Sequence, residues 1–264
     1  MLYIFTAVLL TLILLFFALG IDNNITVTKY DIKSPKIRRN LKIAVISDLH
    51  SCDYGPNQEL LMDKINNHSP DIIVMPGDII DDKRPIDKTI EFFQEITKLY
   101  PCYYTTGNHE IRIDHLAYLK NVIKNHGIEV LDGKCSICND LSICGIDDFE
   151  LGEEVWYSQL NACSNTIESK HFNILLSHRP ERVCDYTNCN FDLVIAGHAH
   201  GGQWRVPHIL NGLYSPNQGL FPKYAGGKYT INKTVLVVSR GLAKENILIP
   251  RLYNPPELVI ININ

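Results

Sequence analysis

The stretch Ile43-Ala44-Val45-Ile46-Ser47-Asp48-Leu49-His50 decides the fold, because an apolar run leads directly into two side chains that can bind metal. A short run of this kind is typical of a strand that is buried on both faces of a sheet. In α/β proteins, ligands bind just beyond the carboxyl ends of such strands. We therefore expect Asp48 and His50 to lie in a ligand site at the end of a strand.

The same arrangement recurs four more times along the chain. Each further run of apolar or β-branched residues is followed by side chains that hard or borderline divalent metals prefer. The runs are 72–75, 103–106, 172–176 and 193–196, and the side chains that follow them are Asp78, Asn108, His178 and the pair His198 and His200. Five strands would thus deliver seven possible ligands to one place.

Helical patterns separate several of these strands. Apolar residues at helical spacing predict helices over 57–67, 86–99 and 115–126, and alternating strands and helices indicate an α/β fold. Later apolar runs, over 141–145, 235–239 and 258–263, have little helix between some of them, which suggests a second sheet packed on the first. Residues 201–229, rich in Gly, Pro and Asn, are expected to form a long loop after the last metal motif.

The composition suits one α/β domain with a small extension. The chain has 264 residues, of which 45% are hydrophobic, and this content is ample for a core. The net charge of −4 gives no electrostatic argument for binding nucleic acid, and no nucleic-acid partner is expected. The notable basic cluster consists of Lys29, Lys33, Lys36, Arg38, Arg39 and Lys42.

An uncharged apolar stretch precedes that cluster. Residues 2–20 carry no charge, and their number is close to the ~20 residues that span a bilayer. A cleaved signal peptide is the alternative, with Ala18-Leu19-Gly20 as a loose cleavage site, but the stretch is long and lacks a basic start. A buried core helix is disfavoured because the stretch has no polar face. We therefore predict a transmembrane anchor over 1–21.

The remaining boundaries follow from this anchor. We expect a juxtamembrane basic segment and the start of the folded domain over 22–40, and the catalytic domain over 41–264. The basic residues after the anchor predict a single-pass protein of the cell membrane with its catalytic domain on the cytoplasmic face. They would also suit contact with anionic lipid headgroups.

The eight cysteines leave several alternatives open. An even number permits disulfides if the domain is exported. The pairs Cys135-x-x-Cys138 and Cys184-x4-Cys189 could instead hold structural zinc. Reduced, partly buried thiols are the preferred interpretation, with Cys135, Cys138 and Cys144 in a hairpin.

Taken together, the metal motifs resemble those of the calcineurin-like metallophosphoesterases over residues 41–264. One motif alone would be weak support, whereas five in order are strong support. The matching series is Asp48-x-His50, Gly77-Asp78-x-x-Asp81, Gly107-Asn108-His109-Glu110, His178 and Gly197-His198-x-His200. The resemblance implies a two-sheet α/β sandwich flanked by helices, here preceded by one transmembrane helix.

The resemblance also implies a site with two divalent metal ions, which could be Mn, Fe or Zn. Asp78 would bridge the two ions, and His109 would be a catalytic residue that binds no metal and assists the leaving group. Asp81 would orient His109, although the adjacent Asp82 is also acidic and either could be a solvated loop residue. The ligands would be Asp48, His50, Asp78 and His200 for one ion, and Asp78, Asn108, His178 and His198 for the other.

Two further residues have more than one interpretation. Glu110 is expected to cap or brace its own loop. Arg179 could contact a substrate phosphate or pair with Glu181.

Such a site predicts a hydrolase of phosphoric esters. Two cations about 3.5–4 Å apart neutralise a phosphodiester and hold its attacking and leaving oxygens. The anchor and the sequence His200-Gly201-Gly202-Gln203 most resemble a bacterial branch of membrane-associated phosphodiesterases, some of which cleave the pyrophosphate of UDP-2,3-diacylglucosamine. We therefore expect a phosphodiester or pyrophosphate substrate that is lipid-linked or a nucleotide sugar.

Two alternatives belong to other classes. A nuclease or nucleotide phosphodiesterase is disfavoured by the acidic charge. A non-catalytic metal-binding scaffold is disfavoured because no ligand and no catalytic histidine is missing. A lipid-linked substrate would suit an exposed apolar lip, for which the candidates are Leu213, Leu220, Phe221 and Pro222.

Overall fold

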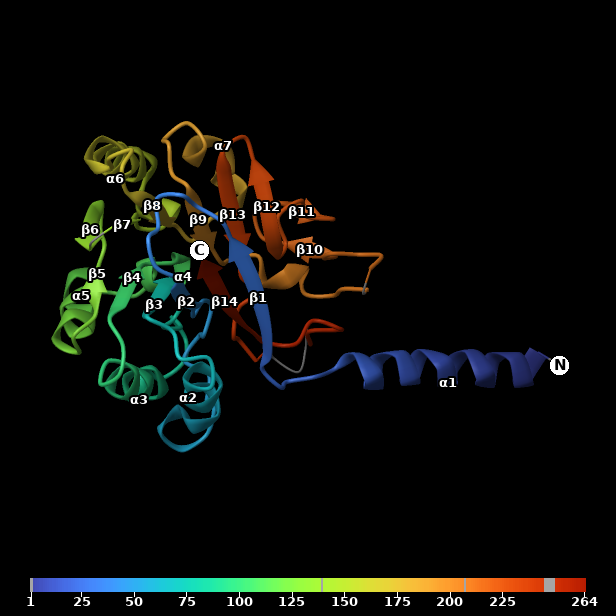
Figure 1. Ribbon diagram of the computed structural model, residues 1–264. Coiled ribbons are helices and arrows are strands. Elements are labelled where there is room, and N and C mark those ends of the chain that lie inside the picture. Colours follow the sequence, from blue (N-terminus) through green and yellow to red (C-terminus); the bar gives the residue numbers. More distant parts are fainter. Residues whose placement is uncertain (1, 139, 207, 245–249) are drawn as a thin grey trace.

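The computed structural model describes residues 2–138, 140–206, 208–244 and 250–264. Two six-stranded sheets face each other, helices cover their outer faces, and helix α1 leaves the domain on one side (Figure 1). The two-sheet α/β sandwich expected from the sequence is therefore confirmed.

The first sheet carries the early metal motifs. Its strands β2, β3, β4 and β5 run parallel, and β14 joins β2 antiparallel. Strand β1 lies parallel to β14 at the edge, so the segment expected as juxtamembrane contributes a strand to the sheet. In spatial order the strands are β1 (Thr26–Ile32), β14 (Glu257–Ile263), β2 (Leu41–Val45), β3 (Ile72–Pro76), β4 (Cys102–Thr105) and β5 (Glu129–Val130).

The second sheet carries the later motifs. Strands β13, β9, β8 and β7 run parallel, and the edge strands β12 and β6 are antiparallel to their neighbours. In spatial order the strands are β12 (Gly227–Ile231), β13 (Thr234–Val238), β9 (Leu193–Ala196), β8 (Phe172–Leu176), β7 (Leu141–Gly145) and β6 (Lys134–Cys138).

Three apolar layers hold the sandwich together. Between the sheets, alternate residues such as Ile43 and Val45 of β2 meet Ile174 and Leu176 of β8. The outer face of the first sheet packs against α2 (Glu59–Asn66), α3 (Asp87–Ile96) and α5 (Leu116–Asn125), close to the predicted helices. The outer face of the second packs against α6 (Glu153–Thr166) and α7 (Val183–Tyr186). Because both faces are covered, the central strands are mostly apolar, as their sequences indicated.

Short elements complete the chain. The stretch 201–229 is mostly loop, as expected, but it also contains a small hairpin and ends in β12. The short elements are η1 (Pro56–Gln58), α4 (Asn108–Ile111), η2 (Phe149–Leu151), η3 (Pro180–Arg182), η4 (His200–Gly202), β10 (Tyr214–Ser215) and β11 (Gly219–Leu220).

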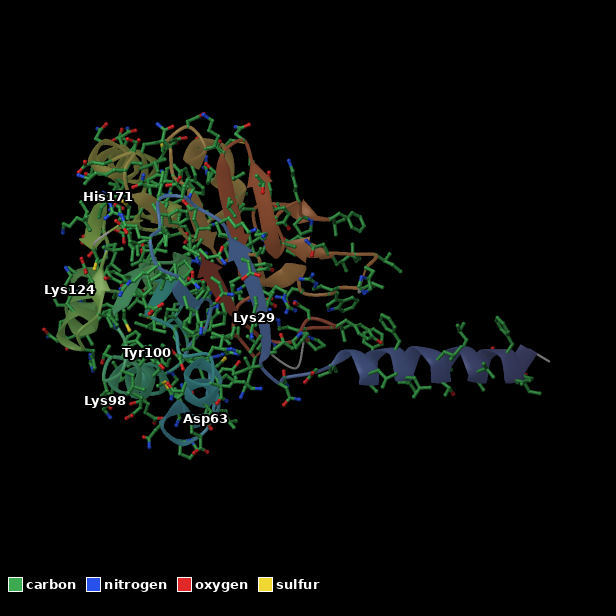
Figure 2. The ribbon with its side chains drawn as sticks, in the orientation of Figure 1. Lys29, Asp63, Lys98, Tyr100, Lys124 and His171 are labelled. Carbon is green, nitrogen blue, oxygen red and sulfur yellow. A yellow bond between two sulfur atoms is a disulfide. The ribbon has the colours of Figure 1, made fainter. Side chains whose placement is uncertain are left out.

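Helix α1 (Leu2–Gly20) is long and apolar enough to cross a membrane, although a signal sequence passes the same test. Most of its side chains stand away from the domain (Figure 2). Its last turn contacts the domain, since the rings of Phe16 and Tyr253 lie 5.1 Å apart and those of Phe17 and Trp204 lie 5.7 Å apart. The backbone N–H of Tyr253 also donates to the carbonyl of Gly20.

The cysteines correct one expectation. Cys135 and Cys144 face each other across β6 and β7 and form a disulfide, so these two are not reduced thiols. Neither predicted zinc pair is gathered in the described part of the chain, where the cysteine cluster is Cys135, Cys144 and Cys163. Cys184 and Cys189 are free thiols.

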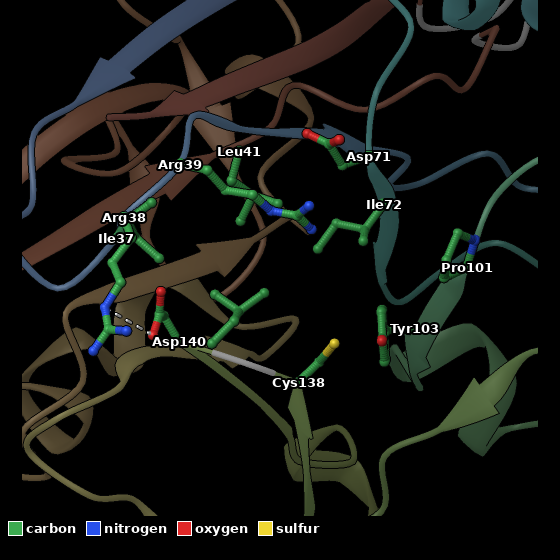
Figure 3. Close-up of a pocket in the computed structure, with 11 residues that line it drawn as sticks. Ile37, Arg38, Arg39, Leu41, Asp71, Ile72, Pro101, Tyr103, Cys138 and Asp140 are labelled. Atoms are coloured by element: carbon green, nitrogen blue, oxygen red, sulfur yellow. Dashed lines mark ion pairs between the residues drawn. The ribbon is translucent and has the colours of Figure 1, made fainter.

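A small cavity lies at the amino ends of the central strands, away from the metal motifs. It measures about 220 Å³, and Arg38 and Arg39 of the basic cluster line it together with Leu41, Ile72 and Tyr103 (Figure 3). Arg38 lies 3.8 Å from Asp140. The basic cluster is thus spread over the edge of the fold opposite to the metal motifs.

Candidate metal centre

The predicted ligands all lie just beyond the carboxyl ends of parallel strands. Asp48 and His50 follow β2, Asp78 follows β3, Asn108 follows β4, and His178 follows β8. His198 and His200 follow β9. Backbone hydrogen bonds tie these loops together, because the N–H of Asp48 donates to Gly77 and the N–H of His50 donates to Asp78. The strands of the two sheets therefore fix the backbone positions of these residues.

Two groups of side chains converge at this edge. In each group the ligand atoms lie within 4.8 Å of one another. Asp78 belongs to both groups and is almost completely buried. The groups are Asp48, His50, Asp78 and His200, and Asp78, His178 and His198. They contain the same acids and histidines as the two ligand sets expected from the sequence.

Among the buried atoms of the described residues that lack a hydrogen-bond partner are two that belong to proposed ligands. They are Nε2 of His50 and the amide oxygen Oδ1 of Asn108. A buried polar atom without a partner costs about 1–3 kcal/mol, so native proteins rarely leave one unsatisfied. Both atoms are good metal donors, and these residues therefore fit a bound divalent ion.

The histidine tautomers also suit metal binding. Nδ1 of His50 lies 3.0 Å from Asp81, and Nδ1 of His178 lies 2.9 Å from the carbonyl of Pro76. Each Nδ1–H donates to its oxygen, so Nε2, which faces Asp78 in both rings, is the atom that would bind a metal. Hydrogen bonds of this kind orient metal-ligating histidines and raise their basicity.

The buried acids and histidines of this site shift one another's pKa values. Burial lowers the pKa of His178, but the carboxylate of Asp78 outweighs it and raises that pKa to about 10. Conversely, burial raises the pKa of Asp78, but the charges on His178 and His50 hold it well below its ordinary value. Burial and the nearby charges of His178 and Arg179 lower the pKa of His198. A proton on His178 therefore balances part of the negative charge that bound cations would neutralise.

The partner of His109 differs from the sequence expectation. Nδ1 of His109 lies 2.5 Å from Oδ1 of Asp82 but 3.9 Å from Asp81. Asp81 instead accepts the hydrogen bond from His50, because its position one residue earlier places it beneath that ring. Asp82 is thus the acid that orients His109, and Asp81 supports a predicted metal ligand. The rings of His109 and His50 meet edge to face at 4.4 Å.

Glu110 braces its loop, as predicted. Its carboxylate is fully buried and accepts hydrogen bonds from the N–H groups of Asp78, Ile79, Ile80 and Gly107. These bonds hold two strand-end loops at a fixed separation. A Cβ at Gly107 would lie only 2.2 Å from Oδ1 of Asp78, so this close approach requires glycine.

A second polar network was not predicted from the sequence. Arg179 makes a two-pronged salt bridge with Asp148 at 2.6 and 2.8 Å and also donates to Asn217. Glu181, the partner considered from the sequence, also forms an ion pair with Arg179, at a longer distance of 3.9 Å. Asn217, in the turn between β10 and β11, lies 2.8 Å from Nε2 of His198. A single Asn in a polar loop carries no signal that would have identified it.

Comparison with known proteins now agrees with this geometry. The family model of the calcineurin-like phosphoesterases matches residues 41–202. The chain belongs to this family. Its members are hydrolases of phosphoester bonds, and they use a dinuclear divalent metal site.

Individual relatives agree with this assignment. The chain is 29% identical over 245 residues to the metallophosphoesterase Cj0846 of Campylobacter jejuni, covering 90% of this chain but 63% of that protein. It is 23% identical over 214 residues to the phosphodiesterase YaeI of Escherichia coli, covering 76% and 74% of the two chains. The crystal structure of TT1561 from Thermus thermophilus shares the fold, with a TM-score of 0.53, 14% identity and 78% and 92% coverage.

Proposed function

We propose that this chain is a membrane-anchored, dinuclear metallophosphoesterase that cleaves phosphodiester or pyrophosphate bonds in a lipid-linked substrate. The observation that carries the proposal is the hairpin β10–β11. Its turn contacts the metal centre through Asn217, whereas the residues that follow, Leu220 and Phe221, are each 66% exposed. The same short element thus connects the reaction centre with an apolar surface.

The two ligand groups support the assignment of the metals. Asp48, His50, Asp78 and His200 would hold one ion, and Asp78, Asn108, His178 and His198 would hold the other. When bound, the ions supply Lewis acidity and a nucleophile at neutral pH. Nothing in the donor set selects among Mn, Fe and Zn.

The chain's own residues then orient and protonate the substrate. Asp82 accepts the Nδ1–H of His109, so Nε2 of His109 is available to protonate the oxygen of the leaving group. Arg179 is held by Asp148 and braces His198 and Asn217, so we assign it a positioning role. Glu110 fixes the loops that carry Asp78 and His109.

The position of the apolar side chains supports a lipid substrate. The hairpin β10–β11 projects on the side on which α1 leaves the domain (Figure 1). Tyr214 and Ile209 are also exposed there, whereas Pro222, expected in the lip, is buried. If α1 spans a bilayer, these side chains would face its surface. A pyrophosphate such as that of UDP-2,3-diacylglucosamine remains the preferred substrate class.

A diester preference is supported by one relative. The name of YaeI describes a phosphodiesterase, and most of its length aligns with this chain.

Two features give opposite indications of the membrane face. Basic residues after α1 favour the cytoplasm, whereas a disulfide is typical of oxidising compartments. The cytoplasmic face therefore stays a prediction.

The first test compares bound metal with hydrolysis. The full chain, purified in neutral detergent, should contain about two metal ions and cleave bis(p-nitrophenyl) phosphate faster than p-nitrophenyl phosphate. Asp78→Asn should lose metal and about 10³-fold in kcat/KM, because it removes ligands worth several kcal/mol and each 1.36 kcal/mol is tenfold. The control is Asp63→Asn, at an exposed acid of α2, which should change neither measurement. Metal-free protein that still cleaves the diester would overturn the proposal.

A further inference from the structure

A second cavity lies beside the base of α1, outside the metal centre. It measures about 380 Å³, is open to solvent, and is lined by residues of β1, β12 and β14 and of the loop after η4. None of its lining residues belongs to the proposed ligands or to the network around His109. The residues that line it are Thr28, Tyr30, Arg205, His208, Gly226, Gly227, Arg240, Tyr253 and Glu257.

The cavity holds more positive charge than its own carboxylate neutralises. Arg240 pairs with Glu257, with Nε and Oε1 2.9 Å apart. Arg205 uses Nη2 to donate to the neutral amide of Asn211, while its buried Nη1 has no hydrogen-bond partner within the described ranges. Two guanidinium groups therefore share one carboxylate.

Arg205 is held in an unfavourable environment. Burial and the neighbouring charge of Arg240 both lower the pKa of Arg205, and Glu257 only partly opposes them. A Cβ at Gly226 would lie 2.6 Å from Cγ of Arg240 and 3.2 Å from Nη1 of Arg205, so the lack of a side chain there lets both arginines approach. An anion within reach of both would supply the missing partner.

A single side chain, that of Tyr253, connects the cavity with helix α1. Tyr253 lines it, and the same residue packs against Phe16 and donates its hydroxyl to the carbonyl of Phe16 at 3.0 Å. Ile209, next to His208 in the same loop, is 85% exposed. Figure 1 shows this loop extending toward the side of α1. The cavity thus lies where a bilayer crossed by α1 would present its headgroups.

We propose that this cavity binds the phosphate of an anionic lipid headgroup through Arg205 and Arg240, and so holds the domain at a fixed tilt on the membrane. Guanidinium groups match phosphate oxygens in geometry, and basic pockets beside transmembrane helices suit such headgroups. The shared chemistry is a phosphate, so free inorganic phosphate is the alternative source. The choice of a lipid rests on the proposed membrane anchoring, whereas the anion site does not.

The test measures binding without turnover, so a failure of the proposed hydrolase activity leaves it intact. The full chain in dodecyl maltoside is titrated with dioctanoyl phosphatidic acid, dioctanoyl phosphatidylcholine or inorganic phosphate, and the rise in Tm is followed. Phosphatidic acid should raise the Tm most. Arg205→Gln should weaken its binding about tenfold, which corresponds to about 1.4 kcal/mol, because it removes a charged donor to the phosphate.

Two variants separate this site from general effects. Arg205→Lys keeps the charge and should retain part of the binding, which shows that loss in Arg205→Gln is not caused by misfolding. Arg38→Gln removes an exposed arginine of the other basic region and should bind as the unmodified chain does.

The outcomes are distinct. Equal shifts with phosphatidic acid for the unmodified chain and Arg205→Gln would overturn the proposal, as would loss in Arg38→Gln alone. If inorganic phosphate gives the full Arg205-dependent shift and phosphatidic acid adds nothing, the site binds free anions and the lipid assignment is wrong.

Discussion

The strand-end loops and the β10–β11 hairpin contribute to the same centre in different ways. The loops after β2, β3, β4, β8 and β9 are fixed by parallel strands and carry all the proposed metal ligands. The hairpin has strands of two residues each and contributes one amide, that of Asn217. The comparison indicates that the sheets hold the metal chemistry, whereas a connection between strands brings the exposed apolar surface to it.

The largest expected effect lies on the strand-end side of this comparison. His109→Ala should keep its metal but lose about 10²–10⁴-fold in kcat, because it removes a general acid that binds no metal. Metal analysis and hydrolysis of bis(p-nitrophenyl) phosphate check both parts. Loss of metal in this variant would show that His109 is a ligand.

The next largest effect is expected at Asp81 and Asp82, because Asp81 contacts His50 and Asp82 contacts His109. Asp81→Asn weakens the support of His50 and should reduce metal affinity about 10–100-fold. Asp82→Asn, its matched neighbour, should lower kcat with the metal retained, since it orients His109. Metal titration and saturating-metal kinetics separate the two. The reverse pattern would restore the role that the sequence suggested for Asp81.

Metal binding should also depend on pH. Although burial lowers it, the carboxylate of Asp78 raises the pKa of His178 from 6.5 to about 10. The proton on His178 therefore stabilises the folded state fully below pH 6.5, and this contribution is lost as the pH rises through 10. A metal must displace that proton, so affinity should rise with pH in this window by up to about tenfold per unit for one proton released. Calorimetry in two buffers with different ionisation enthalpies counts the protons. Binding without proton release would contradict the arrangement of His178 and Asp78.

The smallest effect tests the hairpin. Phe221→Asp should lower hydrolysis of UDP-2,3-diacylglucosamine about threefold to tenfold, because a buried apolar side chain is worth about 1.5–3 kcal/mol and only part of it meets the lipid. Hydrolysis of bis(p-nitrophenyl) phosphate should not change. Leu99→Asp, at an exposed apolar residue after α3, is the control. An equal loss on both substrates would show that the hairpin affects the reaction centre itself and does not act as a separate apolar surface for the lipid.

Much of the fold was predictable because buried strands leave a simple pattern. Each central strand is apolar on both faces and ends at a polar motif, so its position and direction follow from the sequence. Helix α6 was missed although Trp156, Leu160 and Cys163 are four and three residues apart, which is helical spacing on one face. Strand β1 was missed because the charged residues Lys29 and Asp31 interrupt its apolar pattern, and it lies at the edge of the sheet.

The site was predictable to the same extent. The motifs that carry the proposed ligands could be located, because the first ligand in each lies two or three residues after its strand ends. The partner of His109 could not, because Asp81 and Asp82 are adjacent and only the turn of the backbone decides which carboxylate reaches which ring.

The sequence by itself determined the order of most strands and helices, the family and the candidate donors, since all of these depend on residue type and local spacing. Only the tertiary structure brought Asn217 to His198, paired Arg179 with Asp148, and placed Arg205 beside Arg240 at the base of α1. These contacts join segments far apart in the chain. Their positions depend on how loops of unequal length fold back over two packed sheets, and local sequence carries no record of that packing.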